Sequence, residues 1–246
     1  MSGGYDREKG CGISIINVEE EEKVEGVHWH NEGVLWLFEP TNYTHYTYPA
    51  TNAYYMMKDM GWSESTRLLR FVPGKMEPEL AFDFGVAICA SRGMPSEDER
   101  YFYMLVYKGY MTYDKPEWAS KPRLVVVDMK EKKMEFVDIP LEELFEVPYL
   151  DDYGTGWCSV WNGYVYVTPY YTFKGFDGTA LIKYDPSTKK FTRVTPIMEG
   201  GILGLSIIDD KAVLLRDAFP DDVIITVVDL KEEKVLVEDV DISQHD

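Results

Sequence analysis

A repeated pair of β-hairpins constrains the fold of this chain more than any other sequence feature. The first type is an apolar strand, a short polar turn and a returning strand, as in "ALIKYDPSTKKFTRVTPI" from Ala180. The same shape starts again at Arg123 and Val223, more loosely at Arg67, and as a fifth copy at Gly12. Such turns between alternating apolar residues are typical of β-hairpins. The sequence therefore predicts an all-β chain.

A second type of hairpin precedes four of these copies. "GVHWHNEGVLWLF" from Gly26 aligns without a gap with "GWCSVWNGYVYVT" from Gly156. "GLSIIDDKAVLL" from Gly204 fits the same frame with Lys211 at the second glycine position, and "GVAICASRG" from Gly85 begins in the same way. The repeating unit is thus four antiparallel strands.

Four strands repeated every roughly 40–60 residues are typical of a β-propeller blade. The pattern resembles kelch and related β-propellers in repeat shape, although "VTPYY" and "LRDAF" stand where kelch repeats have a glycine pair. An irregular β-sandwich is the competing fold. Hairpins of the first type would be the outer strands of each blade and those of the second type the inner strands. Five outer but four inner hairpins predict a small propeller of about five blades with one incomplete blade, or part of a larger ring. We expect residues 1–11 to be a flexible leader and residues 12–246 to be one domain.

Composition narrows the classes of partner. The formal net charge of −18 argues against binding nucleic acid or an anionic membrane, because both require clustered lysine and arginine. No apolar run approaches the ~20 residues of a membrane span, and no signal peptide is recognisable, so we expect a soluble protein. The compartment stays open, including an extracytoplasmic one after signal removal. Cys11, Cys89 and Cys158 form no CxxC pair, which argues against a disulfide scaffold or a zinc site.

The resemblance to propellers places a site on one face. There the connections from fourth to first strand and from second to third strand would share the mouth of the central channel. Three of the second-to-third connections are rich in aromatic residues, which provide large contact areas at low entropic cost. The alternative is that these rings pack on each other and order long loops.

His28 and His30 lie two residues apart and would face the same side of a strand. In the alignment anchored on Gly26, Gly156 and Gly204, which we call the glycine frame, His28 falls at the level of Cys158 and Ser206. This level would be near the mouth of the channel, and His30 would lie deeper. A hydrogen-bonded histidine is favoured over a metal ligand. The predicted ligand-binding residues are His28, Tyr43, His45, Tyr46, Tyr48, Tyr110, Tyr113, Trp118, Cys158, Tyr170, Tyr171 and Phe173.

These residues favour a non-catalytic propeller that binds a small aromatic or metal-chelate ligand, such as a ferric siderophore or haem. The alternatives are a glycan-active hydrolase or lyase, a carbohydrate-binding propeller, and a protein-interaction scaffold. No GxSxG, HExxH or phosphate-binding glycine loop is present, and no catalytic residue, metal site or cofactor is assigned. A glycan enzyme would need two carboxylates about 5–10 Å apart. The carboxylates expected on the loop face are Glu39, Asp83, Asp151, Asp152, Asp177, Asp217, Asp221 and Asp222.

Overall fold

The structure is a computed structural model that describes residues 2–6, 10–17, 22–24, 35–41, 48–49, 65–71, 79–84, 90–106, 123–154, 156–218 and 222–241. Within these ranges every strand pairing is antiparallel, and the one helix is α1, a single turn at Leu141–Leu144. The prediction of an all-β chain is confirmed. The chain divides into two compact units, residues 1–88 and 89–246. Among the residues placed here, no helix has the length and apolar character to cross a membrane.

The first unit contains two sheets, with strand orders β1-β2-β3 and β5-β4-β6-β7. The hairpins predicted from Gly12 and Arg67 correspond to β2–β3 and β6–β7. Residues 1–11 include β1 and the start of β2. The strands are β1 (Ser2–Asp6), β2 (Gly10–Asn17), β3 (Glu22–Val24), β4 (Leu35–Thr41), β5 (Tyr48–Pro49), β6 (Ser65–Phe71) and β7 (Glu79–Asp83).

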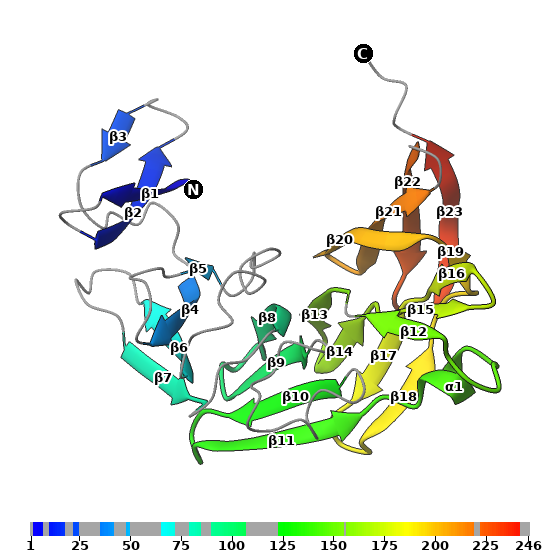
Figure 1. The fold of residues 1–246 in the computed structure, drawn as a ribbon, viewed down its shortest axis with the longest axis horizontal. Coiled ribbons are helices and arrows are strands. Elements are labelled where there is room, and N and C mark those ends of the chain that lie inside the picture. Colours follow the sequence, from blue (N-terminus) through cyan, green and yellow to red (C-terminus); the bar gives the residue numbers. More distant parts are fainter. Residues whose placement is uncertain are drawn as a thin grey trace. The chain divides into compact units, whose positions relative to one another are not determined.

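The second unit contains three four-stranded sheets of the predicted inner-plus-outer hairpin type (Figure 1). Sheet I consists of β8 (Ala90–Pro95), β9 (Tyr101–Val106), β10 (Arg123–Asp128) and β11 (Lys133–Asp138). Sheet II consists of β13 (Cys158–Trp161), β14 (Tyr164–Val167), β17 (Ile182–Asp185) and β18 (Lys190–Arg193). Sheet III consists of β20 (Gly201–Ile208), β21 (Lys211–Ala218), β22 (Asp222–Asp229) and β23 (Lys234–Asp241). In each sheet the four strands pair in chain order.

An aspartate organises the outer turn of all three sheets. Oδ1 of Asp128 accepts the backbone N–H groups two and three residues later, at 3.0 and 2.9 Å, and Asp185 and Asp229 do the same. Asparagine and aspartate commonly stabilise turns in this way. The residue before each returning strand has a positive φ, and these residues are Lys132, Lys189 and Glu233. The repeated Asp-x-x-x pattern therefore encodes the turn directly.

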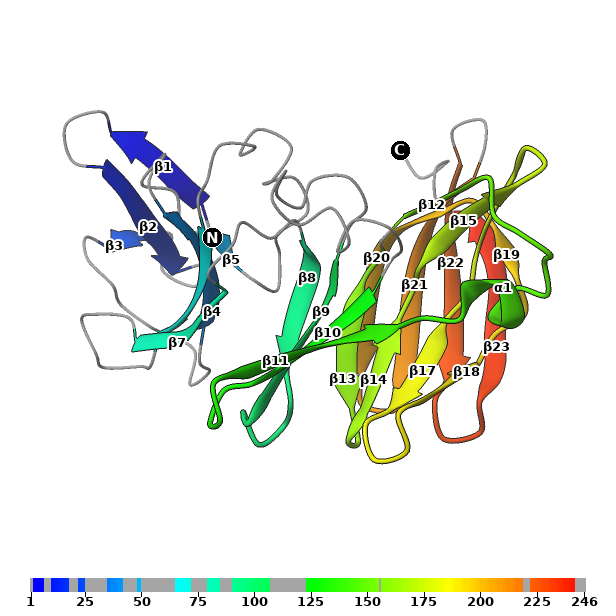
Figure 2. The same ribbon diagram turned by 60° about the horizontal axis from the view of Figure 1, so that its bottom comes forward.

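The three sheets stack face to face (Figure 2), with the edge strand β13 contacting both β8 and β20. One core cluster joins sheet I to sheet II and includes Leu124 and Val165, both fully buried. Another joins sheet II to sheet III and includes Leu181 and Leu214, also fully buried. Burial of both faces of sheet II explains why its strand β14, with the sequence YVYV, is apolar on both sides rather than alternating with polar residues.

The glycine frame is shifted by one residue in sheet III. Trp161 pairs with Tyr164 across the inner turn of sheet II, and Ile208 pairs with Lys211 across that of sheet III. Lys211 therefore occupies the position of Tyr164, not that of the preceding glycine as the sequence alignment implied. The pairs from Gly204–Leu215 to Ile208–Lys211 are regular, and the register irregularity of β20–β21 lies before them, between Ile202 and Gly204. The alignment of Gly204 with Gly156 is therefore itself one residue out.

Candidate functional site

A fourth small sheet is the most elaborate connecting structure among the described residues. We call it the loop sheet, with strand order β12-β15-β16-β19. Its strands are β12 (Asp152–Gly154), β15 (Tyr170–Phe173), β16 (Phe176–Thr179) and β19 (Met198–Glu199). They come from the segment before sheet II, the connection between β14 and β17, and the segment before sheet III. The connections expected to share one face thus pair with each other at one end of the sheets.

Three side chains form a polar row across the loop sheet. Asp152 on β12 pairs with Thr172 on β15, and Thr172 pairs with Asp177 on β16. Directly paired residues point to the same face, so the two carboxylates share a face with the hydroxyl between them. Thr172 Oγ1 donates a hydrogen bond to Asp177 Oδ1 at 2.5 Å, and both aspartates are exposed. Tyr170, two residues before Thr172, lies half-buried on this same face.

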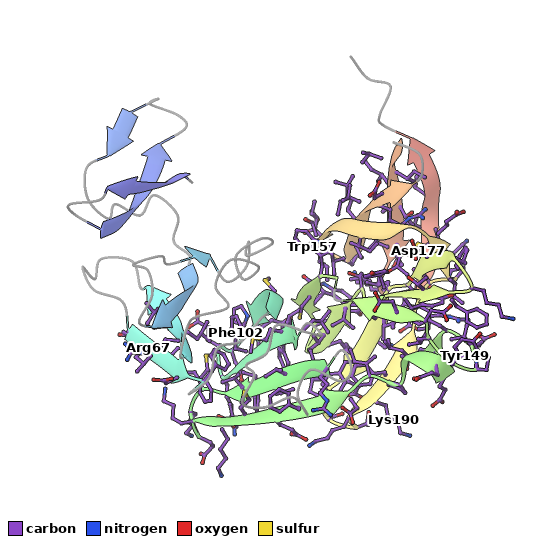
Figure 3. The ribbon with its side chains drawn as sticks, viewed as in Figure 1. Arg67, Phe102, Tyr149, Trp157, Asp177 and Lys190 are labelled. Carbon is purple, nitrogen blue, oxygen red and sulfur yellow. The ribbon has the colours of Figure 1, made fainter. Side chains whose placement is uncertain are left out.

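The opposite face of the loop sheet is aromatic. The rings of Tyr149 and Phe173 pack edge to face with centroids 5.2 Å apart, and the Lys174 ammonium lies 5.1 Å from the Phe173 centroid. Asp151 Oδ2 accepts the Lys174 backbone N–H at 2.6 Å, which ties the turn of the β15–β16 hairpin to the start of β12. Figure 3 labels Tyr149 near α1 and Asp177 on the loop sheet. Phe173 therefore has a partner ring within the fold.

Tyr171 is part of the core between sheets I and II. It is 3% exposed, and its ring lies 4.2 Å from that of Phe145, just after α1. Burial raises the pKa of the Tyr171 phenol. Gly178 on β16 leaves space for this ring, since a Cβ there would lie 2.7 Å from Tyr171 Cε1. This packing fits the alternative that aromatic residues order the connection; ligand contact by Tyr171 stays a prediction.

Cys158 lies at the start of β13 and is 3% exposed. Its thiol points to the backbone oxygen of Tyr103 in sheet I, with Sγ at 3.8 Å from that oxygen. Burial raises the pKa of the Cys158 thiol, which keeps it protonated and unreactive. The structure thus places Cys158 between two sheets, and a role for it in ligand contact remains a prediction.

The other predicted site residues fall outside the described side chains. Tyr48 lies on β5, where its backbone pairs with Phe38, but its side chain is not described. Those outside the described residues altogether are His28, Tyr43, His45, Tyr46, Tyr110, Tyr113 and Trp118, and the deeper His30 lies outside them as well. Among the side chains that are described, no group of three or more His, Cys, Asp or Glu is placed to hold a metal ion.

Two buried polar features near the loop sheet were missed from the sequence. Thr168, fully buried, accepts the Trp157 backbone N–H on its Oγ1 at 2.8 Å, and the Trp157 indole N–H donates to the Ile202 oxygen of sheet III at 3.1 Å. Arg216 on β21 is 2% exposed and donates from Nη1 to the Glu199 oxygen of the loop sheet at 2.6 Å. A lone arginine within the apolar run "AVLLRDA" is the only sequence signal for the second feature.

Comparison with known proteins gives similarity to solved structures only. No protein-family model and no curated protein matches the chain. A puromycin hydrolase S511A mutant complexed with PGG is 14% identical with a TM-score of 0.47, over 74% of this chain and 26% of that chain. A puromycin-hydrolysing peptidase of Mycobacterium tuberculosis is 15% identical with a TM-score of 0.45, over 73% and 26%. An oligogalacturonate lyase of Vibrio parahaemolyticus is 11% identical with a TM-score of 0.34, over 72% and 63%.

The chain spans about a quarter of the length of the first two of these structures. All three are named as enzymes, and this finding contradicts the prediction of a non-catalytic propeller that binds a small aromatic or metal-chelate ligand. That prediction is abandoned. These names describe those proteins and not this chain.

Proposed function

We propose that this chain is part of a glycan-active hydrolase and that the polar row of the loop sheet is its catalytic surface. The single observation that supports this proposal is the pair Asp152 and Asp177 on one face of three adjacent strands. Glycoside hydrolysis uses two carboxyl groups, one that protonates the leaving oxygen and one that activates water or attacks the sugar.

The spacing of the pair favours one stereochemical course. Neighbouring strands lie about 4.8 Å apart, so two strand spacings separate the backbones of Asp152 and Asp177 by roughly 10 Å. Carboxyl groups of inverting enzymes lie about 6.5–9.5 Å apart and those of retaining enzymes about 5–5.5 Å. The hydrogen bond from Thr172 directs the Asp177 carboxylate toward β12. The proposed reaction is therefore hydrolysis with inversion, with a water molecule between the two groups.

Charge and aromatic content support a choice among substrates. A net charge of −18 disfavours a polyuronate and favours a neutral glycan. Hydrolysis then takes precedence over a lyase reaction, which requires a uronic acid. Tyr170 lies on the same face as the polar row, and an aromatic ring beside carboxylates suits the apolar face of a sugar.

We further propose that sheets I, II and III are consecutive blades of a small propeller of about five blades. Their face-to-face stacking and repeated turns support this. The face of sheet III directed away from sheet II carries half-buried aliphatic residues, including the cross-strand pairs Val213–Val227 and Leu215–Ile225. Neither core cluster described above includes them. A further sheet packed on this face would bury these aliphatic residues, in the same way that sheet II buries Leu214 on the opposite face of sheet III.

The experiment is an assay for new reducing ends on a panel of neutral and uronic-acid polysaccharides. We expect cleavage of a neutral glycan by the parent protein and at least a 100-fold lower rate for Asp177→Asn, since positioned acid–base groups contribute about 10²–10⁴-fold. Glu232→Gln, an exposed change in the β22–β23 turn, is the matched control and should retain the parent rate. No cleavage of any polysaccharide, or equal rates for Asp177→Asn and the parent, would overturn the proposal.

A further inference from the structure

A charged side chain in the core of sheet III has no role in the proposed chemistry. Arg216, on β21 next to Leu214 and Leu215, is the largest of the described side chains that are fully buried. Burial of a guanidinium group is unfavourable unless hydrogen bonds replace its hydration. An apolar residue at this position would pack without that requirement. The contacts of Arg216 therefore indicate why the charge is there.

These contacts cross from one sheet to another. Arg216 Nε donates to Thr226 Oγ1 on β22 at 3.3 Å, within sheet III. Its Nη1 donates to the backbone oxygen of Glu199 on β19 at 2.6 Å. β19 is the outermost strand of the loop sheet and only two residues long, so it has few ladder hydrogen bonds of its own. The guanidinium thus fixes a short strand that the loop sheet alone holds weakly.

That short strand in turn holds the backbone of Asp177. Glu199 pairs with Gly178, the residue after Asp177. The Gly200 N–H, one residue beyond Glu199, donates to the backbone oxygen of Asp177 at 3.0 Å. Two consecutive hydrogen bonds therefore connect the buried cation of sheet III to the backbone that carries the proposed catalytic carboxylate.

We propose that Arg216 is a positioning residue that fixes the backbone of Asp177 through Glu199 and Gly200. The positional part stands on the hydrogen bonds alone, and its catalytic consequence rests on the proposed function. Arg216 touches no substrate, so it acts on the turnover step through Asp177 and not on binding. Exchange of buried charges for apolar residues is often neutral or stabilising, so stability alone does not account for a buried arginine. Its role is to hold the backbone geometry of Asp177.

Arg216→Met tests this claim, since methionine fills the space without donating to Glu199. Hydrogen exchange followed by NMR gives the protection of each backbone amide. We expect exchange of the Gly200 amide to accelerate about tenfold in Arg216→Met while amides of β21 and β22 keep their protection. Arg216→Lys, which retains a cationic donor, should restore part of the Gly200 protection. In the glycan assay kcat should fall and KM should stay unchanged.

Arg193→Met is the matched control. Arg193 also donates to a backbone oxygen, that of Leu144 in α1, at 2.6 Å, and has no contact with β19 among those described. It should leave the Gly200 amide unchanged. Equal Gly200 protection in Arg216→Met and the parent would overturn the proposal, and so would a uniform loss of protection throughout sheet III in both Arg216 variants. A parent protein that cleaves no glycan refutes the proposed function, while the exchange result still decides the role of Arg216.

Discussion

Replacement of Gly156 by alanine is the sharpest test of the packing within sheet II, where the residues just before β13 lie against those just after β14. An alanine Cβ at this position would lie 1.7 Å from the Thr168 backbone oxygen and 2.6 Å from its Oγ1. No side-chain rotation relieves a clash with backbone, so the two segments must separate. Separation breaks the bond from the Trp157 N–H to Thr168 Oγ1 at 2.8 Å and the bond from the Thr168 N–H to the Trp157 oxygen at 3.0 Å.

The size of the effect follows from these two bonds. A buried donor or acceptor left without a partner costs about 1–3 kcal/mol, and two such losses with the strain give about 3–5 kcal/mol. For a chain of this size that corresponds to a fall in Tm of about 10 °C. Urea unfolding followed by tryptophan fluorescence measures the free energy of unfolding of Gly156→Ala against the parent.

Gly204→Ala is the matched control, because the sequence frame equated these two glycines. A Cβ at Gly204 would lie 3.5 Å from Leu215 Cβ, which is an ordinary contact. We expect a change within about 1 kcal/mol for this variant. Equal losses in Gly156→Ala and Gly204→Ala, or no loss in the first, would refute the account of the packing.

Three further predictions concern other parts of the second unit. If a further sheet covers the outer face of sheet III, Val213→Asp should lower the free energy of unfolding by about 2 kcal/mol or more. Ile208→Asp, at a residue that is 62% exposed, should change it by less than about 0.5 kcal/mol. Equally small effects of the two variants in urea unfolding would argue against a covering blade. Hydrogen bonds from two lysines lower the pKa of Asp210 from 3.8 to about 2, so the contribution of this carboxylate to stability is present above pH 4 and is lost as the pH falls toward 2. Asp210→Asn should therefore be less stable than the parent at pH 6 and equally stable below pH 2. A difference in unfolding free energy that stays constant with pH would contradict this. In a variant whose other two cysteines are serines, the Cys158 thiol should react with a disulfide reagent at pH 8 only after unfolding, and rapid reaction of the folded protein would contradict its burial.

The hairpins were predictable from the sequence because their information is local. Asn162 and Gly163 adopt positive φ in a two-residue turn, as an Asn-Gly pair between apolar strands indicates. Asp185 caps its turn through hydrogen bonds to residues two and three positions away. Such contacts lie within one short segment, so a pattern of a few residues determines them.

The frame of sheet III was predicted wrongly because the two glycines that anchored the alignment do not occupy equivalent positions. The inner turns align Ile208 with Trp161 and Lys211 with Tyr164, so Gly156 corresponds to Leu203 rather than to Gly204. Since side chains alternate between faces, a shift of one residue reverses the face assigned to each. Cys158 therefore corresponds to Leu205 rather than to Ser206.

The candidate site was only partly predictable, because it depends on pairing between distant segments. Asp152 and Asp177 stood among eight carboxylates expected on the loop face, and nothing in the sequence singled them out. Their common row exists because β12 and β16 both pair with β15, which only the folded chain shows. The link from Arg216 to Glu199 likewise depends on contact between two different sheets.

The stereochemistry of glycan cleavage tests the central claim most directly. Proton NMR of the first product from the neutral polysaccharide that the protein cleaves identifies the anomer released before mutarotation. The separation of Asp152 and Asp177 predicts the inverted anomer. Asp152→Asn and Asp177→Asn should each lower kcat at least 100-fold. The double variant should lower kcat little further, since the effects of two groups that act as a unit are not additive. A retained anomer, or full activity in both single variants, would contradict the assignment of this pair.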